Sequence, residues 1–336
     1  MQISYPFEQH PEPGTVREVA PGVLWVRMPL PFALDHINLW LLQDGAGWTV
    51  VDTGIAQDPV KEHWRQLLAT HPLRRQIVTH WHPDHLGLAG WLEEETGARL
   101  WMTQSEYLTS QMVYGQIGGF GIPAMIGLFR RHGLDDSRIQ AQTDRGNAYK
   151  RNSSPAPATY RRMFDAEHID IGGRDWRVMV GYGHSAEHAA LYCAELKLLI
   201  SGDMLLPRIT TNISVMAVNP DGNPLGLFLD SIAQFKQLPG DTLVLPSHGK
   251  PFRGMQGRID ALGLHHQERC GVLLAAIDQP KTATQLVPVL FERPLDDSFQ
   301  VMFALGETIA HLNYLEHAQQ ITRTETNGII RFAKNQ

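Results

Sequence analysis

One short stretch constrains this chain more than any other: the segment His80–His85 reads HWHPDH and follows the apolar run QIV. In an extended turn His80 and His82 point to the same side, so their imidazoles can share one metal ion. The proline that follows turns the chain and directs Asp84 and His85 toward a neighbouring position. A single ion rarely takes four ligands from six consecutive residues. The spacing therefore favours two adjacent metal ions over the alternative, a solvated histidine-rich loop.

Three further potential ligands lie just beyond β-rich runs. His184 comes after DWRVMVG, Asp203 after LKLLI, and His248 after DTLVL. A layered α/β fold gathers the loops at one edge of its sheets into a functional site. A lone histidine after a strand is more often a capping or packing residue. Several such positions with metal-ligand residue types reverse that expectation and predict one shared metal site.

The order of patterns along the chain predicts a layered α/β fold with a long insertion. Strands and helices alternate at first, with Asp58-Pro59 expected as cap and first turn of a helix and Gly97 closing another. The expected strands are 23–28, 37–43, 48–52, 76–80, 169–173, 175–181, 189–195, 196–203 and 241–246, and the expected helices are 58–70, 86–97 and 224–238. The insertion, 103–160, is apolar and glycine-rich in part, and we expect helical pieces there that cover the site or pack on the core.

The last part of the chain has a different pattern. Helical stretches at 256–278, 282–291 and 298–320 precede two β-rich runs around Asn327-Gly328, a pair typical of hairpin turns. We therefore predict a catalytic domain over 1–254 and a small helical, winged-helix-like domain over 255–336.

Composition excludes several classes. With 43% hydrophobic and 19% charged residues among 336, the chain is typical of a globular protein rather than a disordered one. Its net charge of −6 disfavours a general polyanion binder, although a local basic patch stays compatible with it. Its two cysteines lack a CxxC spacing, and no signal peptide or membrane-spanning run is evident. We expect a cytoplasmic enzyme that makes no membrane contact.

The ordered motifs VVDTG, THWHPDH, GYGHSAEH, SGD and PSHG, spread between Val23 and Phe252, resemble the metallo-β-lactamase superfamily in its glyoxalase II-like branch. The resemblance implies an αββα sandwich with a dinuclear metal site, usually zinc and sometimes iron or manganese. The segment after Met255 resembles, more loosely, the winged-helix tail of the β-lactamase-like protein 2 group, some of which cleave RNA.

The resemblance also implies roles for single residues. It assigns one divalent ion to His80, His82 and His184, a second to Asp84, His85 and His248, and the bridge between the two ions to Asp203. Asp52 matches an aspartate that supports the ligands from behind, unless it is a plain turn residue at a strand end. His188 is expected to donate a hydrogen bond beside the site or to act as a structural residue.

This ligand set implies a hydrolase. Two cations ~3.5–4 Å apart lower the pKa of a shared water and so generate a metal-bridging hydroxide. This hydroxide attacks the carbon of a carbonyl group or the phosphorus of a phosphoryl group. One cation stabilises the oxyanion and the other receives the leaving group. Asp84 is placed to orient the hydroxide and to transfer its proton. The preferred substrate is a small acyl compound, a thioester or carboxylic ester as in a hydroxyacylglutathione hydrolase.

Several alternatives differ in how well they fit. Aspartate at position 203 disfavours a β-lactamase of the cysteine type, and histidine at position 82 disfavours a flavodi-iron protein. A lactonase, a sulfatase or a phosphodiesterase such as an endoribonuclease stays open. The acidic chain and a tail without interleaved basic and aromatic residues disfavour nucleic acid as a partner.

Tyr114 and Phe120, in the Met-, Phe- and Gly-rich stretch 112–130, are candidates to line an acyl pocket, or else core residues. A non-catalytic ligand-binding protein fits the intact ligand set poorly, and the C-terminal domain allows a homodimer.

Overall fold

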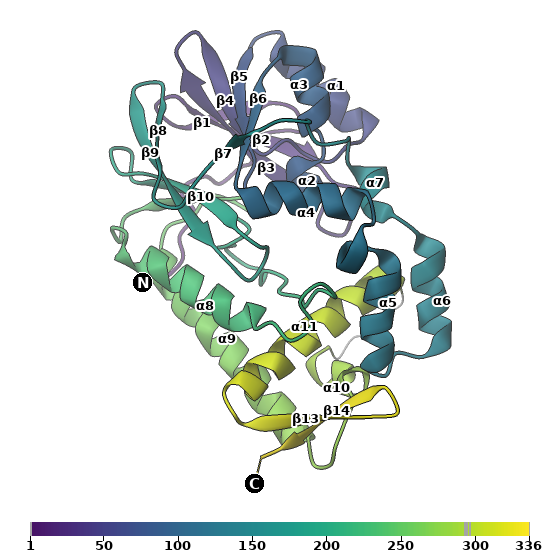
Figure 1. Ribbon diagram of the computed structural model, residues 1–336. Helices are drawn as coiled ribbons and strands as arrows, with labels where there is room; N and C mark the ends of the chain where they lie inside the picture. Colours follow the sequence, from purple (N-terminus) through teal and green to yellow (C-terminus); the bar gives the residue numbers. More distant parts are fainter. Residues whose placement is uncertain (1, 292–294, 296, 336) are drawn as a thin grey trace. The chain divides into compact units, whose positions relative to one another are not determined.

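The computed structural model describes residues 2–291, 295 and 297–335 (Figure 1). It divides into two compact units. Unit 1 comprises Met1–Tyr114, Tyr149–Thr211 and Ser231–Ile259, and unit 2 comprises Gly115–Ala148, Asn212–Asp230 and Asp260–Gln336. Part of the insertion expected from sequence thus groups with the C-terminal helices. The domain border predicted at residue 254 stays a prediction.

Unit 1 contains a seven-stranded sheet in which the strands follow one another in chain order. Its strands are β1 (Val16–Ala20), β2 (Val23–Pro29), β3 (His36–Asp44), β4 (Gly47–Val51), β5 (Leu73–Ile77), β6 (Arg99–Met102) and β7 (Arg161–Arg162). Strands β1 to β4 pair antiparallel, and β4 to β7 pair parallel. Parallel neighbours need crossover connections. The helix α1 (Asp58–Leu68) lies in the connection from β4 to β5, α3 (Ala89–Thr96) in that from β5 to β6, and the insertion connects β6 to β7.

A second sheet of five strands has the order β12-β11-β10-β9-β8. These strands are β8 (His168–Ile171), β9 (Arg174–Gly181), β10 (His188–Cys193), β11 (Leu198–Gly202) and β12 (Leu243–Pro246). Only the pair of β11 and β12 is parallel among these described strands. The end of α8 (Pro224–Gln234) contacts this sheet. The hydroxyl of Ser231 in α8 accepts a hydrogen bond from the N–H of Tyr182, which directly follows β9.

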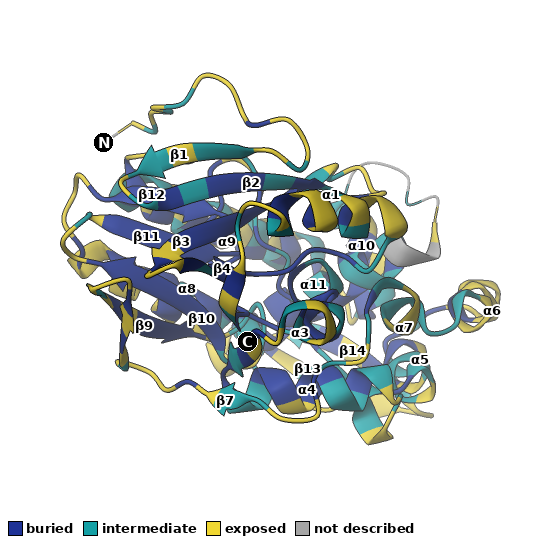
Figure 2. Cartoon of the chain, turned by 90° about the horizontal axis from the view of Figure 1, so that it is seen from above, coloured by how far each residue is buried: buried dark blue, intermediate teal, exposed yellow. Residues whose placement is uncertain are grey.

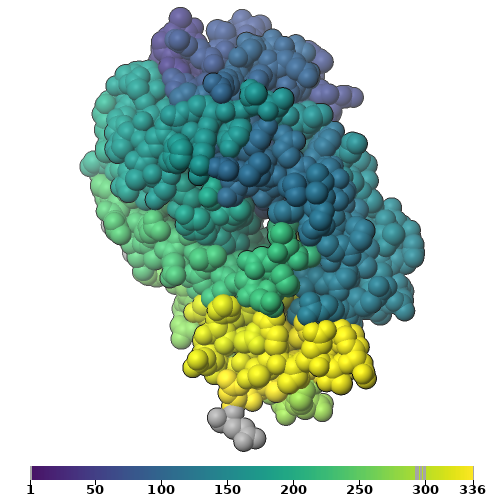
Figure 3. All heavy atoms as spheres, in the orientation of Figure 1, coloured from purple at the N-terminus to yellow at the C-terminus, as the bar shows by residue number. Residues whose placement is uncertain are grey.

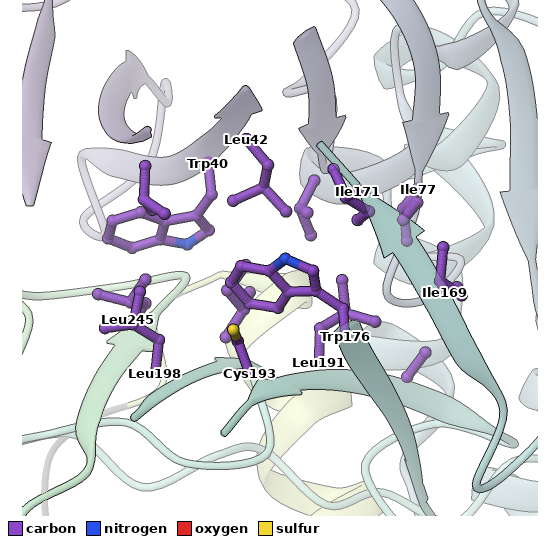
Figure 4. Packing of buried hydrophobic residues seen from close by; sticks show 14 of the residues in the cluster. Trp40, Leu42, Ile77, Ile169, Ile171, Trp176, Leu191, Cys193, Leu198 and Leu245 are labelled. Atoms are coloured by element: carbon purple, nitrogen blue, oxygen red, sulfur yellow. The ribbon is translucent and has the colours of Figure 1, made fainter. Parts of the chain in front are cut away.

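The main core lies between the two sheets. Trp40 and Leu42 of the first sheet face Trp176, Leu191 and Cys193 of the second (Figure 4). All five are at most 1% exposed, and burying a large apolar side chain of this kind contributes about 1.5–3 kcal/mol. The buried strands stand out against the exposed loops in Figure 2.

Helices cover the outer face of the seven-stranded sheet. Val60, Trp64 and Leu67 of α1 and Leu92 of α3 pack there in a second apolar cluster. The apolar face of α1 follows the helical period, which explains why the sequence predicts this helix correctly. Two stacked sheets with helices outside confirm the expected layered fold.

A few expectations about single elements are wrong. The cap of α1 is Gln57, without a side-chain cap hydrogen bond, and Asp58 lies in the first turn. Strand β5 begins at Leu73 and ends at Ile77, so the histidines follow the strand in a loop rather than continue it. Strand β1 was not expected, because its half-exposed sequence VREVA carries little apolar periodicity. The expectation of helical pieces in the insertion is confirmed by α4 (Gln104–Tyr114), the 3-10 turn Gly118–Phe120, α5 (Ile122–Arg131), α6 (Asp136–Arg145) and α7 (Ala148–Asn152).

The three C-terminal helices and the hairpin are confirmed. They are α9 (Met255–Ala276), α10 (Ala283–Leu290), α11 (Ser298–His317), β13 (Ile321–Thr326) and β14 (Ile329–Lys334). Positive φ angles of 52° at Asn327 and 73° at Gly328 form the tight turn that this residue pair favours. Figure 3 shows the residues of α11, β13 and β14 packed together, in yellow. Among the described helices, none has the length and apolarity to cross a membrane.

Candidate metal centre

Four loops at strand ends of unit 1 bring together all seven residues expected to bind metal. His80 and His82 follow β5, Asp84 and His85 lie on the short helix α2 (Pro83–Leu86), His184 follows β9, Asp203 follows β11, and His248 follows β12. They form two groups in which the potential ligand atoms lie within 4.8 Å of one another. The first group is His80, His82, His184 and Asp203, and the second is Asp84, His85 and His248.

In the first group three imidazoles converge. His80 Nε2 lies 2.8 Å from His82 Nδ1 and 3.1 Å from His184 Nε2, and His184 Nε2 lies 3.5 Å from Asp203 Oδ2. Burial, reinforced by neighbouring histidines, lowers the pKa of His80 well below its usual value and the pKa of His82 to about 3. Neutral imidazoles with converging lone pairs are the donors that a borderline-soft divalent ion prefers.

In the second group Asp84 lies between two histidines. Its Oδ2 is 3.6 Å from His85 Nε2 and 3.4 Å from His248 Nε2. Asp203 joins this group too, because its Oδ1 is 3.6 Å from His85 Nε2 and 3.4 Å from His248 Nε2. The two oxygens of one carboxylate therefore face two different groups of donors.

Unsatisfied atoms in this centre fit a bound cation. Within the described residues, His85 Nε2 and Asp203 Oδ1 are buried and have no hydrogen-bond partner. Leaving buried polar atoms unpaired is costly, and a cation placed among them would satisfy both. Burial alone would lower the pKa of His248, but Asp203 and Asp84 raise it to about 10. This charge environment favours a positive species, which a divalent ion supplies.

Asp52 lies behind His85, the position that the family resemblance implies for it. Its Oδ2 lies 2.8 Å from His85 Nδ1, and its Oδ1 accepts a hydrogen bond of 2.8 Å from the Thr79 N–H. Such a bond places the ring proton on Nδ1 and leaves Nε2 as the ligand atom. Asp52 adopts a φ of 64°, a left-handed conformation that is uncommon outside glycine and occurs where surrounding contacts enforce it.

The loop that carries His248 is held by two residues of β3 that sequence reasoning missed. His248 Nδ1 donates to the His36 carbonyl over 2.8 Å, and His36 Nε2 accepts from the Gly249 N–H over 3.0 Å. The amide of Asn38 donates to the carbonyls of Pro246 and Gly249 over 2.8 and 2.7 Å. The available signal was an asparagine inside the apolar run HINLWLL, where a polar side chain needs buried partners.

His188 accepts a hydrogen bond beside the centre at the start of β10, in the manner of the structural residue that was one of its two expected roles. Its Nε2 accepts a hydrogen bond of 3.1 Å from the main-chain N–H of Asp203. Gly202, with a φ of 52°, leaves room for this ring, because a Cβ there would lie 2.3 Å from His188 Nε2. His188 thus helps to fix the main chain that carries Asp203.

The two candidate pocket residues belong to different parts of the chain. Tyr114 ends α4 in unit 1, with Lys150 Nζ 5.3 Å from its ring centroid, and Phe120 lies in unit 2. Their role in lining a substrate pocket stays a prediction.

Comparisons with known proteins show which family this chain belongs to. A family model described as the metallo-beta-lactamase superfamily matches residues 33–248, and one described as a metallo-beta-lactamase-like C-terminal domain matches residues 270–335. The crystal structure of a beta-lactamase domain protein from Burkholderia ambifaria is 44% identical, with a TM-score of 0.92 over 99% of this chain and 98% of that one.

Two curated relatives are named for a hydrolase activity. A probable metallo-hydrolase of Bacillus subtilis, YqjP, is 24% identical over 89% of this chain and 94% of its own length. A hydroxyacylglutathione hydrolase of Albidiferax ferrireducens is 27% identical over 66% of this chain and 65% of its own. The first family model covers well over half of the chain and includes every residue of the two donor groups. This chain belongs to the metallo-β-lactamase superfamily, as a metallo-hydrolase with two groups of candidate metal-binding residues.

Proposed function

We propose that this chain is a dinuclear metal-dependent hydrolase that cleaves a thioester or a carboxylic ester. The observation that carries the proposal is the placement of Asp203. Its Oδ2 faces His184 and its Oδ1 faces His85 and His248, as a carboxylate that bridges two ions requires. A single ion would leave one of these oxygens and its facing histidines without a partner.

The donor set favours zinc. It contains five imidazoles and two carboxylates and no thiolate, and imidazole suits zinc and iron while carboxylate also suits manganese. We propose two zinc ions, with iron or manganese as the outcomes that metal analysis would distinguish. When bound, two such ions lower the pKa of a water between them and stabilise an oxyanion.

Asp84 has the position expected for a proton-transfer group. Its side chain is 18% exposed, against 11% for Asp203 and 0% for His85, so it is the most accessible carboxylate of the centre. We propose that Asp84 accepts the proton of the attacking water and delivers it to the leaving group or to solvent. His85 and His248, on either side, hold the carboxylate in place.

The thioester class is supported by chemistry and by one distant relative. A thiolate leaving group, with a conjugate-acid pKa of about 8.5, departs without strong protonation, so it matches a centre in which the more accessible carboxylate, Asp84, is the proposed proton-transfer group. The hydroxyacylglutathione hydrolase relative has this kind of substrate in its name.

A substrate panel tests this proposal. Acyl thioesters, carboxylic esters, lactones, bis-phosphodiesters and structured RNA would be assayed with the wild type, with Asp84→Asn and with a control. Asp175→Asn is a matched control, because Asp175 is 65% exposed on β9 and pairs with His168 outside the centre. We expect thioester or ester hydrolysis that falls by at least about 10²-fold in Asp84→Asn alone. Cleavage of RNA only would overturn the substrate class, and an active Asp84→Asn would overturn the role of Asp84.

A further inference from the structure

The carboxylate of Glu106 is buried beside the first donor group, and nothing in the proposed reaction uses it. Glu106 lies in the first turn of α4 and is 0% exposed. An acidic residue in a first turn is an ordinary sequence feature, since it complements the helix dipole at the surface. Burying a carboxylate is costly unless strong hydrogen bonds compensate the lost hydration. Its partners therefore indicate what it does.

Both oxygens of Glu106 accept hydrogen bonds from main-chain N–H groups of ligand-bearing loops. Oε2 accepts from the Trp81 N–H over 3.0 Å, and Trp81 stands between the ligands His80 and His82. Oε1 accepts from the Glu187 N–H over 2.6 Å, in the loop that begins with His184. One side chain thus joins the loop after β5 in the first sheet to the loop after β9 in the second.

Neighbouring contacts reinforce this connection. The carbonyl of Glu187 accepts a hydrogen bond of 2.7 Å from the Thr103 hydroxyl, and its carboxylate accepts one of 3.0 Å from the Ser105 N–H. The carbonyl of Trp81 accepts a hydrogen bond of 2.7 Å from the Tyr149 hydroxyl. The N-terminal end of α4 and the side chain of Tyr149 therefore fix the main chain on both sides of the first donor group.

The spacing of these loops decides whether the first group can share an ion. His80 and His82 come from one loop and His184 from the other, and His80 Nε2 lies 3.1 Å from His184 Nε2. A relative shift of the loops by one ångström would take His184 out of coordination range, because metal–nitrogen bonds are about 2.0–2.1 Å long.

We propose that Glu106 is a positioning residue: its carboxylate sets the distance between the His80–His82 loop and the His184 loop, and so sets the affinity of the first donor group for its ion. This inference rests on the proposed metal function. Glu106 acts through two main-chain N–H groups and touches no substrate. It affects the first group selectively, because the second group depends instead on Asp52, His36 and Asn38.

The test compares Glu106→Gln with Glu93→Gln. A glutamine at 106 keeps the shape but offers one acceptor oxygen and turns an NH₂ group toward the other N–H. Glu93 is the matched control, because its carboxylate accepts one main-chain bond, of 3.2 Å from the Leu100 N–H, outside the ligand loops. The binding of each of two Zn²⁺ ions would be measured by competition with a chromophoric chelator, and the absorption spectrum of Co²⁺-loaded protein would be recorded. Thermal unfolding of the metal-free variants would report general stability.

We expect Glu106→Gln to lose about 10–100-fold in affinity for one ion, the usual cost of removing a partner behind a ligand, and to retain the other ion. Its Co²⁺ spectrum should change, while Glu93→Gln should match the wild type in both readouts. Wild-type affinities for both ions in Glu106→Gln would overturn the positioning role alone. An equal loss of both ions that only follows a lower melting temperature would overturn it as well. A wild-type protein that binds no metal would instead overturn the proposed function, and this inference with it.

Discussion

The buried histidines of the two units differ in what faces them. In unit 1, His85 and His248 face the carboxylates of Asp84 and Asp203, which overcome the effect of burial and raise their pKa. In unit 2, burial lowers the pKa of His132 and of His266 to about 3, and Glu325 opposes the shift at His132 without reversing it. Burial also keeps His80 and His82 neutral, so burial by itself does not distinguish a packing histidine from a ligand. What distinguishes the centre of unit 1 is that several histidines and carboxylates converge there.

The contacts of the unit 2 histidines are those of packing residues. The ring of His132 stacks on Phe332, with centroids 5.9 Å apart and planes 15° apart. His266 Nδ1 lies 3.1 Å from His311 Nε2, and the other nitrogen of His311 contacts the Glu307 carbonyl. Throughout the described part of the chain, three or more candidate ligands come together only in the two groups of unit 1.

The largest expected effect comes from the residue that joins the two donor groups. Asp203→Asn removes the negative charge that both groups share, so we expect weaker binding of both ions and a loss of turnover of at least about 10³-fold. Steady-state hydrolysis and metal content per chain measure this. Near-wild-type turnover with two ions bound would show that the Asp203 carboxylate does not join the two donor groups.

A smaller effect is expected from the residue that holds the His248 loop. Asn38→Asp keeps the shape but replaces two N–H donors to the carbonyls of Pro246 and Gly249 with a buried carboxylate. We expect about 10–100-fold weaker binding of the ion in the second group, measured by chelator competition. Gln43→Glu, the same chemical change at an exposed position of β3, is the control. Equal behaviour of the two variants would mean that Asn38 does not position His248.

The stability of unit 2 should decrease at acidic pH, because the buried His132 is uncharged in the folded chain. Burial, with help from Arg323 and Arg131 and against Glu325, lowers the pKa of His132 to about 3, while an unfolded histidine titrates near 6.5. The unfolded chain therefore binds the proton first, and the stabilisation present above pH ~6.5 is lost as the pH falls toward ~3. Between pH 7.5 and pH 5.5 the free energy of unfolding should fall by about 1.4 kcal/mol from this residue.

The variant His132→Phe isolates this contribution, because phenylalanine preserves the stacking on Phe332 and removes the titrating group. Denaturant unfolding of wild type and variant at pH 7.5 and pH 5.5 gives the difference. Parallel pH dependence in the two proteins would show that the pKa of His132 is the same in the folded and the unfolded chain, which contradicts the expected lowering.

The smallest effect on the metal centre should come from His266→Phe. His266 packs against Phe228, with ring centroids 6.1 Å apart, and faces no carboxylate in its hydrogen bonds. We expect metal content and turnover to stay within about twofold of the wild type, whereas His80→Phe should abolish binding at the first group. A loss of metal in His266→Phe would contradict the distinction between the ligand histidines of unit 1 and the packing histidines of unit 2.

The sequence predicted some parts of the fold and of the metal centre and not others. The ordered motifs predicted the sandwich and the seven residues of the two groups, because each stands at a strand end, where local pattern is informative. The roles of Asn38 and Glu106 depend on contacts with residues distant in the chain, such as the bond from Asn38 to Gly249. The local pattern marks Asn38 as a polar residue in an apolar run, but it does not show which partners Asn38 or Glu106 binds. The strand β1 and the cap at Gln57 were missed because exposed or weakly patterned residues give little signal. The zinc ions, the thioester and the cytoplasmic location stay predictions.

The metal content of the wild-type protein tests the central claim most directly. Protein purified without chelator would be analysed by inductively coupled plasma mass spectrometry, and hydrolysis would be assayed before and after removal of metal. The two oxygens of Asp203, each facing its own group of histidines, predict two transition-metal ions per chain and activity that disappears on chelation and returns with metal. A metal-free chain that hydrolyses its substrate at an undiminished rate would contradict the account.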